Sequence, residues 1–534
     1  MNKILFGLLL CSLPVIATAQ ETFDALKNSE TELRGTARFQ SMAGAFGALG
    51  GDLSTLSQNP GGIGVYRSSD AGITMSLDFN SSKTNLSSDN DTRFNVNNAG
   101  YVGTIRTGSE VVPYFNIGFT YQRQMDFHRH YRGTVGALNT SITNHIASYT
   151  GNYNESDLGV ANDYNPYYST SAPWASILSY NSYLINYNNG GWQGLYGDGT
   201  TGSGEFEVDQ SGHTDEYNIS FGGNVNNTVF WGATVGLTDL DYKSYTYYGE
   251  TLNNAYIYDH NGNTGIVDGT ADYRYENYLH TEGTGYNFKL GVIVKPVNEL
   301  RLGLAFHTPT YYDMKDRYAS SAAFQMTPAG ATDGGYYGTN YAGNYAGYGD
   351  GSMDEVRYDI HTPWHFIASI AGVMGREGIL SFDYEYVGNG SIRVCDDNGH
   401  AYTDVTDRVK DYLQASHIFR VGGEYRVTPD WSLRAGYSYQ TSPVKDVVKD
   451  NQANITTVSN NTAYEFDKSI QHLTLGLGYH YKGFYADMAY VHKWRTSQYN
   501  AFSPIVGIGY TEPGVNAEVK DNNNRVVLTM GFRF

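Results

Sequence analysis

The chain has 534 residues, and its 35 Lys and Arg against 54 Asp and Glu give a formal net charge of −19 at pH 7. This acidic balance argues against nucleic acid as a partner. The mean hydropathy of −0.44 resembles that of a soluble protein, which does not exclude membrane strands that expose only alternate residues to lipid.

Residues 1–19 are predicted to form a secretory signal peptide. Met1–Lys3 is a short basic start, Ile4–Ile16 is apolar, and Ala17–Ala19 has the small-x-small pattern of a cleavage site. The apolar run is too short for a membrane-spanning helix, which needs about 20 apolar residues. Cys395 is the single cysteine of the predicted mature chain, so we expect no intramolecular disulfide.

Residues 20–70 are predicted to form a separate N-terminal segment, because they do not alternate as a strand does. Small residues dominate between Gly35 and Gly64, as is typical of backbone packed closely against other structure. The larger apolar residues of the segment are Phe39, Met42, Phe46, Leu49, Leu53 and Leu56. This content is too apolar for a disordered tail. We expect a hatch that lies in the lumen of the barrel predicted below.

Residues 71–534 contain about fourteen segments in which apolar and polar residues alternate, which is the pattern of β-strands. We expect strands near Gly72–Phe79, Ala99–Thr107, Pro113–Gln124, Glu216–Gly223, Val229–Tyr242, Gly285–Lys295, Leu300–Tyr311, His361–Val373, Gly378–Val387, His417–Val427, Trp431–Gln440, His472–Tyr481, Phe484–Lys493 and Arg525–Phe534. An even number of strands suits a single-chain bacterial barrel. The predicted fold class is therefore all-β, a transmembrane antiparallel β-barrel of about fourteen strands.

The strands agree on which face meets lipid. Leu380, Phe382 and Tyr384 alternate with Ser381 and Asp383. A charge facing lipid would cost about 2–4 kcal/mol at the midplane. We therefore expect the polar set to face the lumen.

The connections between strands alternate in length. Short turns such as Pro296–Glu299 and Lys482–Gly483 alternate with long polar connections, of which Met125–Asp215 is the longest. Bacterial barrels have short periplasmic turns and long extracellular loops. We expect a monomer with long extracellular loops and with both termini on the periplasmic side.

The last strand ends on an aromatic residue, Phe534. A last strand that pairs with the first leaves no unpaired edge in lipid. We expect the protein to lie in the bacterial outer membrane, and Phe534 to contact the barrel assembly machinery.

Several motifs carry a resemblance to a known family. Gly35–Gly64 resembles the N-terminal hatch of the FadL/TodX family of outer-membrane long-chain fatty acid and hydrocarbon transporters. The Asn-Pro-Ala motif of that family appears as Asn59-Pro60-Gly61, and the glycine is expected to loosen the turn. Arg301–Pro309 resembles the seventh strand of the family, Thr362–Trp364 the start of the eighth, and Trp431–Val444 the eleventh.

The resemblance implies passive uptake of hydrophobic compounds such as long-chain fatty acids. The hatch, with Phe46, Asn59, Pro60 and Gly61, would gate the channel. A kink in the third strand would release the compound sideways into the membrane, and Gly118 is the expected weak point. Lateral exit is physically reasonable, because an apolar molecule loses its hydrophobic gain when it crosses to water. The expected partners are such hydrophobic molecules, outer-membrane lipid and lipopolysaccharide.

Three arginines are candidates for binding the head group of an amphiphile: Arg38 of the hatch, and Arg301 and Arg434 of the wall. A buried carboxylate without a cation is costly, which is why such a site needs a positive charge. Arg434 has an alternative role, since it can pair structurally with Asp383 or Glu385.

Other chemistries have weaker support. His128-Arg129-His130 and His361–His365 lack the ligand pattern of a haem or metal site, and we interpret them as polar histidines at the membrane interface. The sequence shows no arrangement of Ser, His and Asp that indicates a catalytic triad, so we expect no enzymatic activity. We also expect no metal and no cofactor. The alternative functions are a general porin, a haemin-binding receptor and a surface adhesin scaffold.

Overall fold

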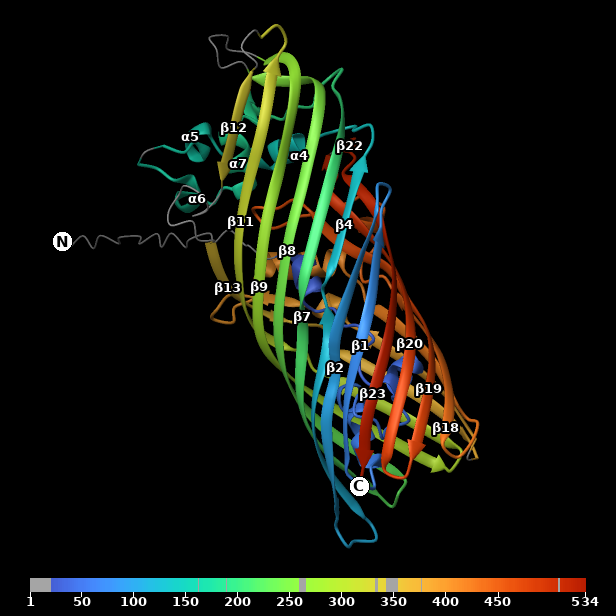
Figure 1. Cartoon of the computed structure of the whole chain (residues 1–534). Coiled ribbons are helices and arrows are strands. Elements are labelled where there is room, and N and C mark those ends of the chain that lie inside the picture. The colour runs from blue at the N-terminus through green and yellow to red at the C-terminus, as the bar shows by residue number, and fades with distance from the viewer. Residues whose placement is uncertain are drawn as a thin grey trace, which may run out of the picture.

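The chain forms a closed barrel whose wall consists of 14 antiparallel strands (Figure 1). The computed structural model describes residues 21–534 except 162, 189, 259–265, 332–334, 342–353, 376 and 508–509. Around the wall the strands are β1 (Asp70–Lys83), β2 (Ser88–Arg106), β3 (Tyr114–Asp126), β7 (Thr201–Val225), β8 (Val229–Tyr258), β9 (Ile266–Val297), β10 (Leu300–His307), β14 (His365–Met374), β15 (Gly378–Val387), β17 (Ser416–Arg426), β18 (Trp431–Thr441), β19 (Tyr464–Tyr481), β20 (Phe484–Phe502) and β23 (Val515–Arg533). β23 pairs with β1 and closes the wall. The predicted fold class is confirmed.

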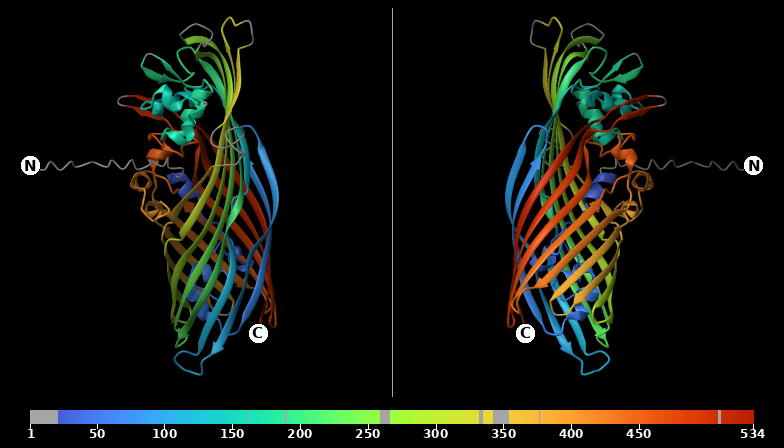
Figure 2. Two further views of the ribbon diagram at one scale, coloured as in Figure 1. Left: turned by 90° about the vertical axis from the view of Figure 1, so that its left-hand side faces the viewer. Right: turned by 90° about the vertical axis from the view of Figure 1, so that its right-hand side faces the viewer.

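Most other elements gather at one end of the barrel, which we call the loop end (Figures 1 and 2). The strands are β4 (Arg129–Val135), β5 (Asn186–Asn188), β6 (Gly191–Gln193), β11 (Tyr311–Pro328), β12 (Tyr336–Tyr341), β13 (Asp354–His361), β16 (Arg393–Cys395), β21 (Ile505–Gly507) and β22 (Tyr510–Glu512). The helices are α4 (Ile142–Thr150), α5 (Glu155–Leu158), α6 (Pro166–Ser169), α7 (Trp174–Asn181), η3 (Asn389–Ser391), α8 (Thr403–Tyr412) and α9 (Asp446–Lys449). The opposite end, the turn end, carries short connections. Among the described residues, no helix has the length and apolarity needed to cross a membrane.

The outer surface of the wall carries a band of apolar side chains. Leu77 and Phe79 of β1 are exposed on this surface. Ser76 and Asp78, which alternate with them along the strand, are buried on the inner side. Successive side chains of a strand point to opposite faces. The observed arrangement, with apolar groups outside and polar groups inside, agrees with the prediction from the sequence.

Two predicted strand boundaries are wrong, and proline is the reason in both cases. The seventh strand was expected to reach Tyr311 but ends at His307, before Pro309. The eighth was expected from His361 but begins at His365, after Pro363. Proline has no backbone N–H to donate to a strand pair. The two strands therefore pair with each other up to His307 and His365.

Other strands are longer than predicted. β8 continues to Tyr258 and β9 begins at Ile266, and they stay paired over this extension. A long connection was expected after Phe79, but β1 and β2 continue to a tight turn in which Thr84 N donates to Ser87 O. Beyond the lipid-facing band, outward residues are polar, so the alternation fades although the pairing continues.

The N-terminal segment lies inside the barrel, where it forms α1 (Thr22–Lys27), α2 (Ala37–Ser41), α3 (Thr55–Gln58) and the 3-10 helix η1 (Pro60–Val65). Figure 2 shows it in dark blue, running from the loop end to the turn end. At the loop end Glu21 pairs with Arg408 of α8 at 2.9 Å. The expectation that both termini lie at the turn end therefore holds for Phe534 (Figure 1) and is wrong for the first described residues. The predicted signal peptide, residues 1–19, lies outside the described residues, as does residue 20.

Wall glycines make room for this segment. A Cβ atom on any of them would lie less than 3 Å from an atom of the segment: Gly118 (β3), Gly222 (β7), Gly232 (β8), Gly291 (β9), Gly303 (β10), Gly422 (β17), Gly436 (β18) and Gly476 (β19). Glycine within a strand is typical of places where another part of the backbone approaches closely. Polar wall side chains complete the contact, as when Thr474 Oγ1 donates to Ser41 O at 2.9 Å and Asn116 Nδ2 donates to Ile63 O at 2.7 Å.

Candidate functional site

The Asn59-Pro60-Gly61 turn holds two parts of the N-terminal segment together. Asn59 Oδ1 accepts from Gly61 N at 3.0 Å and caps η1, while Asn59 Nδ2 donates to Gly47 O at 2.5 Å. Pro60 occupies the first position of the helix, where its missing N–H is not needed. A Cβ atom on Gly61 would lie 2.9 Å from the Val292 Cα. Glycine here permits close contact with β9, rather than loosening the turn as the sequence suggested.

Phe46 lies at the centre of the same segment. Its ring is fully buried, 5.6 Å from that of Phe39. The guanidinium of Arg38 lies 5.3 Å from the Phe46 ring, a distance typical of a cation–π contact. Phe46 therefore packs the core of the segment.

Two of the candidate arginines share one carboxylate. Arg38 Nε lies 2.9 Å from Glu424 Oε2, and Arg434 Nε lies 2.6 Å from the same oxygen. Arg434 Nη1 also pairs with Asp487 at 2.6 Å. The expected partners of Arg434, Asp383 and Glu385, bind other groups.

Those groups belong to the segment and to the wall. Asp383 Oδ2 accepts from Gly47 N at 2.8 Å, and Glu385 pairs with Arg420 at 2.6 Å. The third candidate, Arg301, donates from Nη1 to Leu49 O at 2.8 Å. The side chains of the three arginines thus lie where the N-terminal segment meets the wall. Their role in ligand binding stays a prediction.

The pairing of the third wall strand is irregular, but not at Gly118. At this residue β3 is paired on both sides, with Val102 of β2 and Ser220 of β7. Gly118 instead accommodates Leu56 of the segment, whose Cδ2 would lie 2.6 Å from a Cβ atom there. The pairing of β3 is therefore regular at Gly118, and a role of this residue as the weak point stays a prediction. The register of β3 against β7 shifts between Arg123 and Met125.

Between this point and the loop end, β2 and β3 are not joined by backbone hydrogen bonds. Pairing between β2 and β3 ends at Asn98 and Gln122, although β2 continues to Ser88 along β1. At the loop end the gap is closed again, because Asn85 Nδ2 donates to Thr134 O at 2.6 Å. We call this stretch without backbone pairing, between residues 88–97 of β2 and the β3–β4 chain, the β2–β3 window.

Side chains cross the window near its lower edge. Asn95 Nδ2 of β2 donates to Asp126 Oδ2 of β3 at 2.8 Å, and Arg123 Nη1 donates to Asn95 Oδ1 at 2.8 Å. Arg34 of the N-terminal segment reaches the same place, with Nη1 donating to Asn97 at 2.9 Å and Nη2 lying 3.3 Å from Asp126. The window is thus held by side chains rather than by backbone pairing.

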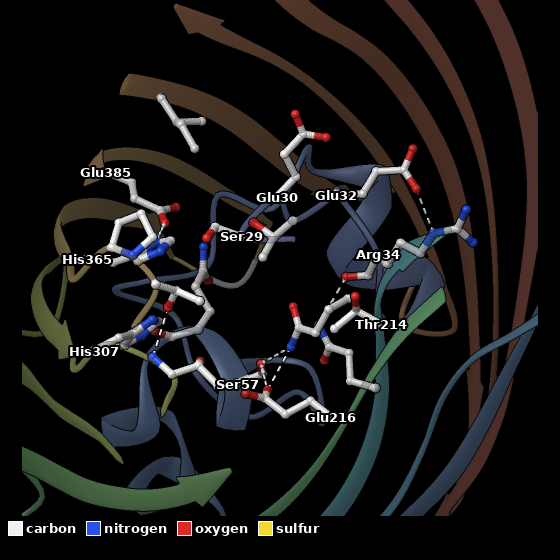
Figure 3. A pocket seen from close by; sticks show the side chains of 18 of the residues that line it. Ser29, Glu30, Glu32, Arg34, Ser57, Thr214, Glu216, His307, His365 and Glu385 are labelled. Atoms are coloured by element: carbon white, nitrogen blue, oxygen red, sulfur yellow. Dashed lines mark hydrogen bonds and ion pairs between the residues drawn. The ribbon is translucent and has the colours of Figure 1, made fainter. Parts of the chain in front are cut away.

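A cavity of about 150 Å³ lies beside the segment in the lumen. Figure 3 shows Ser29, Glu30 and Arg34 of the segment on one side, and His307, His365 and Glu385 of the wall on another. The lining is mostly polar and contains several ion pairs. Lys289 Nζ, for example, lies 2.6 Å from Glu216 Oε1.

A second cavity, of about 90 Å³, lies nearer the loop end and has an aromatic lining. Phe23 of α1 faces it together with Tyr242, Tyr464 and Tyr499 of the wall. Phe23 and Tyr464 pack at 4.9 Å between ring centroids. The N-terminal segment therefore lines both cavities.

A sequence profile of the family described as outer membrane protein transport protein (OMPP1/FadL/TodX) matches residues 210–482, slightly more than half of the chain. The chain belongs to this family. The resemblance predicted from the hatch and strand motifs is confirmed.

A solved structure has the same fold. A Pseudomonas aeruginosa FadL homologue aligns with a TM-score of 0.51 at 14% identity, covering 95% of this chain and 100% of that one. The Pseudomonas putida toluene transporter TodX gives 0.44 at 12% identity, covering 95% and 100%. The Ralstonia pickettii toluene transporter TbuX gives 0.46 at 14% identity, covering 94% and 99%. No curated protein matches the sequence.

Three of the four histidines singled out in this FadL/TodX-family chain lie beside carboxylates, and the fourth, His361, packs its ring against Tyr311. His128 Nδ1 lies 2.6 Å from Asp126, His130 Nε2 lies 3.0 Å from Glu207, and His365 Nδ1 lies 2.7 Å from Glu385. These contacts are those of polar histidines in a hydrogen-bonded wall.

One group of possible metal ligands occurs in the described part of the chain, formed by Asp241, His280 and Glu282. Lys315 lies 2.9 Å from Glu282 and Arg317 lies 3.2 Å from it. These cations already balance the carboxylate, so the group has the chemistry of an ion-pair network.

Sequence reasoning missed the polar residues of the larger cavity, and one signal pointed to them. Lys289 is a charged residue within the predicted strand Gly285–Lys295, at an inward position. A charge there needs a partner on a neighbouring strand. Glu216, the inward residue at the start of its predicted strand, was the candidate partner for Lys289.

Proposed function

We propose that the protein is an outer-membrane channel for passive uptake of hydrophobic compounds such as long-chain fatty acids. In this proposal the N-terminal segment gates the channel, and the compound leaves sideways into the membrane through the β2–β3 window. Membership of the FadL/TodX family supports the transport of hydrophobic compounds, and the names of TodX and TbuX point to toluene for those two proteins.

One observation carries the proposal: Arg34 binds both edges of the window. It donates to Asn97 on β2 and lies within 3.3 Å of Asp126 on β3. Arg34 belongs to the N-terminal segment, so a shift of the segment removes it from the window. The movement that opens the gate would therefore also withdraw Arg34 from the window and allow lateral release.

The position of the window suits release into lipid. Phe94 of β2 is 62% exposed beside the window, and its partner on β1 is Leu77 of the apolar band. A hydrophobic compound that passes between β2 and β3 here stays in contact with apolar surface and keeps its hydrophobic gain. The straight path to the turn end is filled by the buried segment around Phe46 and Leu56, which argues against a general porin.

The aromatic cavity is the proposed first stop on the way in. The rings of Phe23, Tyr242 and Tyr464 offer apolar contact surface, and the tyrosine hydroxyl groups add polar atoms at its edge. Because Phe23 belongs to the N-terminal segment, a compound bound there contacts the proposed gate directly.

Cross-linking the window tests the proposal. The side chains of Asn95 and Asp126 meet across it, so we suggest the double variant Asn95→Cys/Asp126→Cys and a short, reducible bifunctional thiol reagent. Cys395, the other cysteine of the described chain, is buried. Cells carrying the cross-linked variant are expected to lose uptake of a fluorescent fatty acid, and reduction is expected to restore it. The single variants, treated alike, serve as controls, and undiminished uptake after complete cross-linking would exclude this exit.

The surroundings of the channel are part of the same proposal. Lys243 lies above the apolar band, on the outer face of β8, whereas its neighbour Tyr242 is buried on the inner face. Cations at this height suit the phosphate groups of lipopolysaccharide. Phe534, 64% exposed, is the proposed contact with the barrel assembly machinery, and deleting it is expected to reduce the amount of folded protein in the outer membrane. We further propose that the barrel works as a monomer.

A further inference from the structure

Lys493 of β20 is a buried cation whose partner belongs to the N-terminal segment. Its Nζ lies 2.6 Å from Glu32 Oε1, and the two side chains are 9% and 8% exposed. Among the described residues, Glu32 is the one group to which Lys493 Nζ donates a hydrogen bond or with which it forms an ion pair. The charge of this wall residue is therefore balanced at close range by the segment and not by the wall.

Glu32 also connects this pair to the β2–β3 window. Its Oε2 lies 2.7 Å from Arg34 Nε and 3.2 Å from Arg525 Nη2. Its backbone N donates to Gln124 O of β3 at 2.8 Å, where the register of that strand shifts. Arg34 is two residues further along the segment and binds both edges of the window. A displacement of Glu32 therefore also moves the residue that spans the window.

A shift of the segment leaves Lys493 without an anion. Arg34 moves with the segment, and Arg525 keeps Asp78 at 3.0 Å. A buried charge that loses its partner is costly, so the wall opposes any shift that removes Glu32 unless another anion takes its place. An alcohol or an alkane does not neutralise the ammonium group, and an amine adds a second positive charge. The vacated position therefore selects an anion.

The pair can be reached from the lumen. Glu32 and Lys493 both line a third cavity, of about 60 Å³, and Glu32 also lines the larger cavity of about 150 Å³, where it lies beside Arg34 (Figure 3). Leu33 of the segment and Ile418 of the wall line both cavities. Burial of an alkyl chain against such side chains is favourable. A molecule with a carboxylate and an alkyl chain thus finds partners for both of its parts.

We propose that Lys493 binds the head group of an anionic amphiphile, and that Glu32 occupies this site while the channel is closed. The carboxylate of a fatty acid replaces that of Glu32 at Lys493 Nζ, and the released Glu32 stays with Arg34 as the segment shifts. This inference rests on the proposed transport function and names the contact through which the substrate opens the gate. The site lies on a different residue from the three candidate arginines.

Ligand binding to the purified full-length barrel in lipid nanodiscs tests the exchange. The probes are decanoate and decan-1-ol at pH 8, where decanoate is ionised, and the measurement is isothermal titration with the signal of empty nanodiscs subtracted. In Glu32→Gln the internal competitor is gone, so decanoate is expected to bind at least about tenfold more tightly than to the natural protein. The affinity for decan-1-ol is expected to stay the same. No gain for decanoate, or an equal gain for decan-1-ol, would overturn the proposal.

Lys493→Met tests the other half of the pair. The variant leaves Glu32 with Arg34 and Arg525, so the fold is expected to stand even if that of Glu32→Gln does not. Without the cation, decanoate is expected to bind about tenfold more weakly than to the natural protein. Unchanged binding would contradict the assignment.

Asp487→Asn is the matched control. Asp487 is also a buried carboxylate 2.6 Å from a buried cation, Arg434, but it belongs to the wall and lines neither of the two cavities that Glu32 lines. Its affinity for decanoate is expected to equal that of the natural protein. An equal gain in the control and in Glu32→Gln would show that the gain does not belong to the Glu32 position.

Opening of the gate is the second measurement. Decanoate is expected to raise the single-channel conductance of the natural protein in planar bilayers, whereas decan-1-ol at the same concentration is expected to leave it unchanged. In Lys493→Met the increase with decanoate is expected to disappear. Conductance that responds alike to both probes, or that responds to decanoate in Lys493→Met, would contradict the exchange.

The uptake assay separates this inference from the proposed function. If uptake depends on the β2–β3 window but decanoate binds alike to the natural protein, Glu32→Gln and Lys493→Met, the channel function stands and the exchange at Lys493 is wrong. If the affinities change as expected but cells take up no hydrophobic compound, the site stands and the channel function is wrong.

Discussion

Gly291 of β9 and Asn59 of the N-terminal segment touch so closely that a Cβ atom on Gly291 would lie 1.9 Å from Asn59 Oδ1. The same oxygen accepts the hydrogen bond from Gly61 N that begins η1. The wall therefore contacts the segment at the residue that holds its turn together.

Replacing this glycine is expected to loosen the segment. In Gly291→Ala the new methyl group displaces Asn59, which breaks the cap and shifts the turn away from β9. We expect higher single-channel conductance and faster leakage of small hydrophilic solutes in planar bilayers and in cells. Deleting residues 35–64 sets the upper limit of that leakage.

Gly372→Ala is the matched control for this prediction. Gly372 lies on β14, and a Cβ atom there would have nothing within 4 Å. The control is expected to behave as the natural protein. Equal conductance of both variants at the low level of the natural protein would mean that the turn does not seal the lumen.

Arg434→Ala is expected to destabilise the barrel. The Arg434 side chain is 1% exposed and binds both Glu424 and Asp487, so its loss leaves buried carboxylates without a full set of partners. Breaking a buried pair in this way costs about 3–5 kcal/mol. The temperature at which the folded barrel loses its heat-modifiable mobility in gels is expected to fall.

Arg301→Ala provides the comparison. Arg301 donates to one backbone carbonyl, Leu49 O, so a smaller change in stability is expected. Fatty acid uptake measured on the same variants separates structure from ligand binding. Lost uptake with normal folding would support the predicted ligand role of either arginine.

The two ends of the barrel are expected to face opposite compartments. Glu155 of α5 is exposed at the loop end, and Glu299 is exposed in a turn at the other end. A glutamyl endopeptidase applied to intact cells should cut at Glu155 and spare Glu299. After the outer membrane is permeabilised, Glu299 should be cut as well. Cleavage of intact cells at Glu299 alone would invert the orientation.

The packing of α4 at the loop end is expected to depend on pH. His145 is buried against Phe502 and Tyr149, with ring centroids 5.5 and 5.4 Å away. Burial lowers the pKa of His145 to about 4, from an ordinary value of 6.5. As the pH falls through this range, the unfolded state takes up a proton before the folded state does. The stability of this packing is therefore lost between about pH 6.5 and 4, by about 3 kcal/mol.

Hydrogen exchange of residues 142–150 measured against pH checks this expectation. His145→Phe is expected to abolish the acid-induced increase in exchange, because the ring that takes up the proton is gone. His400 is exposed, and His400→Phe is expected to leave the increase unchanged. An increase that persists in His145→Phe would assign it to another group.

The sequence predicted the wall well because lipid imposes a strict alternation on each strand. Leu77 and Phe79 face outward and Ser76 and Asp78 inward, as their order along the chain requires. The same pattern failed beyond Phe79, where both faces of the β1–β2 hairpin are polar. Strand ends were also missed where proline, as at Pro309, breaks the pairing.

The candidate site was harder to predict, because it depends on which strands meet. Arg434 was expected to be an inward cation, but its partners Glu424 and Asp487 follow from the registers of four neighbouring strands, β17 to β20. The β2–β3 window has no signal in the sequence at all. The alternation of Phe94 and Val96 with Asn95 and Asn97 continues through it, since alternation reports the two faces of a strand and not whether its edge is paired.

The N-terminal segment is held by β23, the strand that closes the wall against β1. Thr529 Oγ1 of β23 accepts from Ala37 N at 2.7 Å, and Arg525 Nη1 donates to Leu33 O at 2.8 Å. β23 therefore contributes both to the closure of the wall, through its pairing with β1, and to the anchoring of the segment in the lumen, and a chain cut short before β23 loses both sets of contacts.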